Sequence, residues 1–106
     1  MLVTEALQPV PTAFRALLEQ LVSQFAAGNF IVDGHDCGPW VRDYPATLVP
    51  LPPEAWDVAR AGRVTDRGWW ITVPLWTAEE GRSDLTLTAD ASEYPTRVTG
   101  VDIHVL

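Results

Sequence analysis

The sequence predicts one α+β domain over residues 1–106, in which an N-terminal amphipathic helix packs on an antiparallel β-meander of three to four strands. A second short helix is expected before the meander. Apolar residues repeat with the helical period between residues 12 and 28, and with the period of a half-buried strand from residue 69 onward. The chain has 106 residues, which suffices for one core. Neither element buries its apolar side alone, so we expect the helix to cover the meander.

The first helix is expected over Thr12 to Gly28. Pro11 suits its first turn, where a missing N–H costs no hydrogen bond. Gly28 or Asn29 can adopt the left-handed conformation that ends a helix. The apolar residues that share one helical face are Phe14, Leu17, Leu18, Leu21, Val22 and Phe25.

The middle of the chain predicts little regular structure. Residues 30–32 are a candidate short strand, and residues 33–39 are rich in turn formers and predict a loop. Four prolines between residues 45 and 53 argue against a regular central strand or helix there.

The second helix is expected over Glu54 to Ala61, with Trp56 as its apolar anchor. Gly62 is expected to end this helix.

The meander is expected to bury one face of three strands. Pairing Leu75 with Leu85, and Leu85 with Ile103, aligns their apolar residues on that face. Strand 69–77 is expected at an edge, because Pro74 cannot donate to a ladder, and strand 84–90 in the centre. The residues expected on the buried face are Ile71, Val73, Leu75, Leu85, Leu87, Ala89, Val101, Ile103 and Val105.

Composition limits the class of protein. The formal net charge is -7, the wrong sign for neutralising phosphates, so we expect no nucleic-acid partner. Cys37 is the only cysteine, so no internal disulfide forms, which fits a reducing compartment. No signal peptide and no long apolar run are visible, and we therefore expect a cytoplasmic protein without a membrane partner.

Two tryptophans and a group of carboxylates are the candidate contact residues. Trp70 and Trp76 point away from the expected core, so either residues 30–52 cover them or they form a binding surface. The turn after Trp76 is either a solvated turn or an acidic knob for a basic partner. Its acidic residues are Glu79, Glu80 and Asp84, and a second acidic group contains Asp33 and Asp36.

Histidines suggest an alternative ligand site. The expected register places Trp76, Asp84 and His104 in one exposed row, where a carboxylate beside an imidazole could act as an acid–base pair. An ordinary cross-strand surface pair is the favoured interpretation. His35 lies in a group of potential metal ligands with Asp33, Asp36 and Cys37, but their spacing matches no metal signature. We expect no metal and no other cofactor.

The stretch WTAEEGRSDLTL at residues 76–87, with WWITVPL before it, resembles the strand-turn-strand core of a family of small, uncharacterised bacterial domains. The ending VDIHVL and the segment FAAGNF after the first helix are similar in kind. This resemblance implies no established activity and no catalytic residues. In size and acidity the chain is also similar to immunity proteins of bacterial toxin systems.

Three functions stay open. The leading hypothesis is a non-catalytic protein-binding domain, an immunity-type inhibitor of a basic bacterial toxin, because no phosphate loop, nucleophile elbow or CxxC motif is present. The rival is a small-ligand-binding protein or small enzyme with a Trp-lined pocket on the sheet, using His104, Asp84 and His35. The third is a homodimer through the exposed sheet face or an edge strand.

Overall fold

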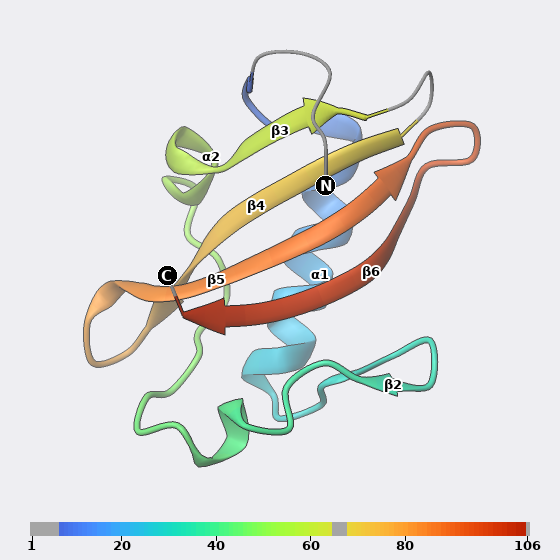
Figure 1. The fold of residues 1–106 in the computed structure, drawn as a ribbon. Helices are drawn as coiled ribbons and strands as arrows, with labels where there is room; N and C mark the ends of the chain where they lie inside the picture. Colours follow the sequence, from blue (N-terminus) through green and yellow to red (C-terminus); the bar gives the residue numbers. More distant parts are fainter. Residues whose placement is uncertain (1–6, 65–67, 106) are drawn as a thin grey trace.

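The structure is a computed structural model that describes residues 7–64 and 68–105, apart from the side chain of Arg42. A four-stranded antiparallel sheet packs with one face against a long N-terminal helix, and a two-stranded hairpin lies beyond the last strand (Figure 1). These elements confirm the α+β class and the helix-on-meander arrangement.

Helix α1 (Thr12–Ala26) begins directly after Pro11 and buries the expected stripe. Gly28, at φ +95°, takes the left-handed conformation that follows the helix. Leu17 and Leu21 lie at the border of the stripe and are half-buried. The residues of α1 that are fully buried are Phe14, Leu18, Val22 and Phe25.

The main sheet has the order β3-β4-β5-β6, with every neighbouring pair antiparallel. Its strands are β3 (Arg60–Arg63), β4 (Gly68–Thr77), β5 (Gly81–Ser92) and β6 (Arg97–Val105). The expected alternation is confirmed on β4, where Ile71, Val73 and Leu75 are all buried against the helix side. β5 is a central strand, as the sequence predicts.

The prediction that β4 is an edge strand is wrong. β3 pairs with it from Arg60↔Thr72 to Arg63↔Trp69. Pro74 lies beyond the last of these pairs, so its missing N–H costs no bond to β3. The edges of the main sheet are therefore β3 and β6.

The second helix is shorter than predicted. Helix α2 spans only Ala55–Val58, because the chain turns at Ala59 into β3. Gly62 does not end the helix but pairs with Trp70. Trp56 anchors α2 as expected: its ring is buried, and its Nε1 donates a hydrogen bond to Glu19 of α1 at 3.3 Å.

The strand registers differ from the expected ones in two places. Val73 pairs with Leu87 as predicted, but β5 bulges opposite Leu75, so Leu75 does not pair with Leu85. The buried Ser83 hydroxyl donates to the Leu75 carbonyl at 2.8 Å, which satisfies a backbone group at this bulge.

Between β5 and β6, Leu87 pairs with Ile103, whereas Leu85 was expected opposite that residue. The slip is two residues, an even number, so each side chain keeps its face of the sheet. The expectation that Val105 is buried is wrong: it lies at the end of β6 and is 47% exposed.

Residues 31–36 form a hairpin whose second strand lies in the segment predicted as a loop. β1 (Ile31–Val32) and β2 (His35–Asp36) are joined by Asp33 and Gly34, both at positive φ. Asp-Gly is a preferred sequence for such a two-residue turn and was the available signal.

The tract after the hairpin closes one end of the core and contains a short 3-10 helix (Val41–Asp43). Leu48 bridges to Thr77, and the Val49 N–H donates to the Trp76 carbonyl at 3.1 Å. The tract thus pairs with the last residues of β4, beyond the segment of that strand with which β3 pairs. Its core residues are Cys37, Val41, Leu48 and Leu51.

Candidate functional site

The sheet face opposite α1, here called the outer face, carries the two predicted tryptophans. Trp70 and Trp76 are both half-buried. They stand six positions apart on β4, a separation of roughly 20 Å along a strand. Among the described elements, no helix or strand lies in front of this face (Figure 1). The third tryptophan of β4, Trp69, is on the opposite face and packs edge-on against Phe14 of α1 at 6.4 Å.

The acidic turn between β4 and β5 is partly committed to internal contacts. The Glu79 carboxylate accepts hydrogen bonds from the Thr47 N–H at 2.7 Å and from the Thr47 hydroxyl at 2.9 Å. The Thr47 N–H bond is the main reason why the pKa of Glu79 is lowered. Glu80, Arg82 and Asp84 are exposed. These three side chains therefore remain accessible to a partner, whereas Glu79 also holds the fold together.

The expected row of Trp76, Asp84 and His104 does not form. Trp76 pairs with Arg82, and His104 pairs with Thr86. The bulge in β5 and the slip of β6 together separate the three residues. His104 instead has a carboxylate neighbour on its own strand: its Nδ1 lies 3.5 Å from Oδ2 of Asp102.

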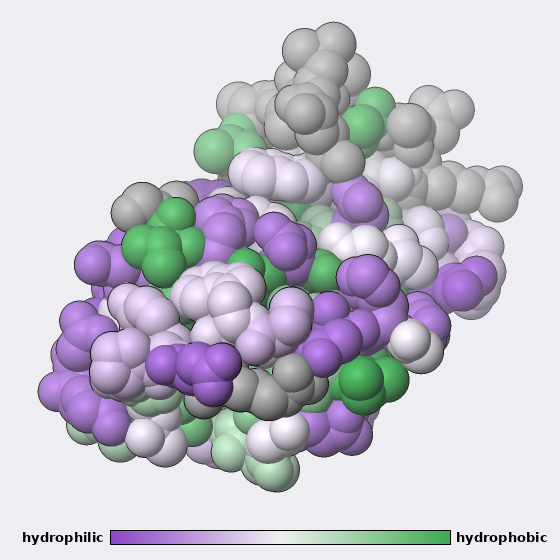
Figure 2. All heavy atoms as spheres, turned by 60° about the horizontal axis from the view of Figure 1, so that its bottom comes forward, coloured by the Kyte–Doolittle hydropathy of each residue, from purple (hydrophilic) through white to green (hydrophobic). Residues whose placement is uncertain are grey.

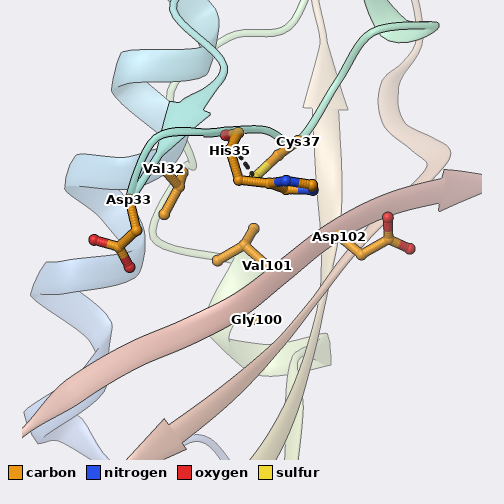
Figure 3. A pocket seen from close by; sticks show the side chains of 7 residues that line it. All are labelled: Val32, Asp33, His35, Cys37, Gly100, Val101 and Asp102. Carbon is orange, nitrogen blue, oxygen red and sulfur yellow. Dashed lines mark hydrogen bonds between the residues drawn. The ribbon is translucent and has the colours of Figure 1, made fainter.

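A cleft of about 380 Å³ lies between the β1–β2 hairpin and β6, and we call it the hairpin cleft. Figure 3 shows Asp33 at one end of it, with the His35 ring and Asp102 toward the other. His35 and Asp33 come from the hairpin, whereas Asp102 comes from a strand more than sixty residues later. The lining residues are Val32, Asp33, His35, Cys37, Gly100, Val101 and Asp102.

Cys37 borders this cleft but is only 6% exposed. Burial raises the pKa of its thiol, and the negative charges of Asp36, Asp102 and Asp33 raise it further. A reactive cysteine needs the opposite environment, in which nearby positive charge favours the thiolate. The thiol therefore stays protonated at neutral pH.

A second cleft of about 280 Å³ adjoins the first, and we call it the helix cleft. The two share Val32 and Asp33, and the helix cleft continues between α1 and the start of β6. Its lining residues are Leu17, Leu21, Val32, Asp33, Thr96, Arg97 and Val98.

A third cleft of about 310 Å³ lies over Phe25, Phe30 and Val41. No tryptophan lines any of these three clefts, so they do not correspond to the Trp-lined pocket of the ligand-site hypothesis. Within the described ranges, no three His, Cys, Asp or Glu side chains gather as a metal site.

The structure divides the predicted contact residues among three places. Trp70 and Trp76 are on the outer face, the acidic turn lies at the end of β4, and Asp33 lies at the clefts. Asp36 caps a turn, because its Oδ1 accepts the Gly38 N–H at 3.0 Å. Sequence reasoning missed Asp102, which links the hairpin cleft with His104. The only signal for Asp102 in the sequence is that it is a polar residue between two apolar ones, Val101 and Ile103.

These features define a small α+β domain with two adjoining clefts along its last strand and a sheet face that none of the described helices or strands covers. Residues 22–106 match the profile of the family described as "Domain of unknown function (DUF7668)", and the chain belongs to this family. The match runs from the second half of α1 through the whole main sheet. Membership confirms the expected likeness to a small domain family without an assigned activity. No curated protein and no solved structure matches the chain.

Proposed function

We propose that this chain is a non-catalytic protein-binding domain whose partner is a basic protein, and that it acts as an immunity-type inhibitor of a bacterial toxin in the cytoplasm. The observation that carries the proposal is the outer face, where two half-buried indoles lie on a domain of net charge -7. Tryptophan is among the residues that contribute most to binding free energy at protein interfaces. Complementary charge accelerates the encounter with the partner.

The distribution of charge also supports a basic partner. Asp84 and Asp102 are exposed on β5 and β6, and Glu80 is exposed at the turn between β4 and β5. Among the described residues, a basic side chain lies within 4 Å of only one of these three carboxylates: Nδ1 of His104 is 3.5 Å from Oδ2 of Asp102. Carboxylates around an aromatic centre form a polar rim of the kind that protein interfaces have. In the described parts of the chain, no helix has the length and apolar character that crossing a bilayer requires.

The test is affinity capture from a bacterial lysate, followed by binding measurements with the purified partner. We expect a basic protein whose affinity falls as salt concentration rises. Trp70→Ala and Trp76→Ala should each weaken binding by about tenfold or more, the effect of removing an interface anchor. Tyr94→Ala is the matched control, since Tyr94 is 79% exposed in the β5–β6 turn. Thermal unfolding of each variant checks that the fold persists.

Two results would contradict the proposal. One is a partner whose affinity is unchanged in both tryptophan variants, which would show that the outer face is not the contact surface. The other is failure to recover a basic protein at any salt concentration.

The hairpin cleft supports a second candidate function, binding of a small ligand. Its volume of about 380 Å³ falls in the range of ligand pockets, and it combines His35 and Asp102 with apolar walls. A ligand screen read by the NMR shifts of His35 tests this candidate. Saturable shifts with a metabolite, abolished in His35→Ala, would favour it over protein binding.

A further inference from the structure

We propose that the free edge of β6 binds an extended, basic segment of the partner protein as an added β-strand, with basic side chains of that segment entering the hairpin cleft. The proposal deepens the proposed function and rests on it for the basic character of the partner. It goes beyond that function in naming a second contact surface and a mode of binding.

One edge of β6 has no described strand beside it. β6 pairs with β5 on one side only. In the parts of the chain that the structure describes, no backbone hydrogen bond joins the other side of β6 to another segment. An edge strand has unpaired N–H and C=O groups that can pair with an extended chain. The other edge strand, β3, is already joined to Gln8, which pairs with Ala61.

A groove made of the two clefts lies beside the free edge of β6. The hairpin cleft lies at Gly100 to Asp102, and the helix cleft lies at Thr96 to Val98, so the two follow β6 in succession. Together they form the edge groove, which extends roughly 20 Å at the rise of a strand. Apolar side chains supply part of its lining from both walls: Leu17, Leu21, Val32, Val98 and Val101. A peptide strand can therefore bury alternate side chains there while its backbone pairs with β6.

Charged residues of both signs line the groove, with the carboxylates at one end and an arginine at the other. Asp33 and Asp102 are exposed and come from opposite walls of the hairpin cleft. Arg97 lies at the far end, in the helix cleft. An arginine or lysine on the added strand would meet carboxylates at the Asp102 end, whereas an acidic or neutral residue suits the Arg97 end.

The same charges argue against a second copy of this chain as the occupant. Pairing of two β6 edges would bring two copies of net charge -7 together, and Asp102 lies on that edge. Figure 2 turns the β6 side forward and shows hydrophobic residues only in small groups among hydrophilic ones.

The experiment uses synthetic strands and the isotope-labelled full chain. The probe is an acetylated, amidated octapeptide of alternating arginine and valine. One control replaces arginine with glutamate, and a second carries N-methyl groups on the valines, which removes backbone donors but keeps the charge. We expect the arginine peptide to shift the β6 amide signals and to slow hydrogen exchange of those that face the groove. Both control peptides should bind at least about tenfold more weakly. The glutamate peptide loses the charge attraction, and the N-methylated peptide loses backbone hydrogen bonds to β6.

Variants of the chain test the position of the basic side chains. Asp33→Asn and Asp102→Asn should each lower the affinity for the arginine peptide by about fivefold, which is the effect of losing one exposed ion pair. Asp57→Asn is the matched control, an exposed carboxylate on α2. Equal binding of the N-methylated peptide, shifts confined to the outer face, or a dimer of the free chain in light scattering would each overturn the proposal.

The outcomes separate this proposal from the proposed function. If the octapeptide leaves β6 unchanged while the tryptophan variants still lose the captured partner, only strand addition is wrong. If the octapeptide occupies the edge but no basic protein is captured, the proposed function is wrong and the edge remains a peptide site.

Discussion

The carboxylate of Glu79 accepts two hydrogen bonds from Thr47, which lies thirty-two residues earlier in the chain. This contact ties the β4–β5 turn to the tract that pairs with the last residues of β4. The backbone adds a third bond nearby, from the Ala78 N–H to the Thr47 carbonyl at 2.9 Å. Glu79, which the sequence predicts as a contact residue for a partner protein, thus also stabilises the fold.

The first prediction concerns the pH dependence of this contact. Because the pKa of Glu79 is lowered in the folded state, its ionised form stabilises the fold above the unfolded pKa. That contribution is lost as pH falls through the folded pKa. Glu79→Gln should therefore lower the melting temperature at neutral pH, and the difference from wild type should shrink in acid. Glu80→Gln controls for the charge, and a difference independent of pH would contradict the assignment.

The second prediction concerns the buried hydroxyl of Thr86. The residue is 2% exposed, and its Oγ1 has no hydrogen-bond partner among the described residues. Thr86→Val removes this unpaired group while keeping the β-branched shape, and should raise the free energy of unfolding by about 1 kcal/mol. Urea denaturation measures the change, with Thr88→Val as the half-buried control on the same face. A loss of stability in Thr86→Val would show that the hydroxyl has a partner.

The third prediction concerns the reactivity of Cys37. Burial and three nearby carboxylates raise the pKa of its thiol, so a disulfide reagent should modify the native protein at least about tenfold more slowly than the urea-unfolded chain. Asp102→Asn removes one of the charges and should increase the native rate slightly at mildly alkaline pH. A native rate equal to that of the unfolded chain would contradict the buried, protonated thiol.

The fourth prediction concerns the packing of Gly38 beneath Phe30. A Cβ at Gly38 would lie 2.6 Å from Cδ1 of Phe30, whose ring stacks on Phe25 at 5.2 Å. Gly38→Ala must displace that ring and should cost about 1–3 kcal/mol of unfolding free energy. Gly34→Ala, at φ +77° with open space around it, isolates the cost of backbone strain alone, about 1 kcal/mol. Similar losses in both variants, with unchanged aromatic signals in NMR, would argue against the contact.

The elements that periodicity predicts are those with one-sided burial. Phe14, Leu18 and Val22 repeat at helical spacing because only one side of α1 meets the sheet. Ile71, Val73 and Leu75 recur at every second position because β4 has one face toward α1. These patterns are local, so they can be read without knowing the partner element.

The missed elements depend on partners far away in the chain. Residues 60–63 contain two arginines and a glycine, a poor strand composition. They form β3 because β4 offers an edge with which they can pair. Asp102 joins the hairpin cleft only because β6 passes beside a hairpin formed by residues 31–36. The spacing of residues within either segment does not predict that the hairpin and β6 lie side by side.

The sequence alone was enough to predict the class of fold, the main helix, the buried side of each long strand and the acidic character of the surface. These properties follow from hydrophobic periodicity and from composition, which neighbouring residues carry on their own. The tertiary structure alone decided the registers, the edge strands, the internal role of Glu79 and the groove along β6. Each of these depends on pairing between distant segments, where several registers keep the same residues buried and only the packing of the whole domain selects one.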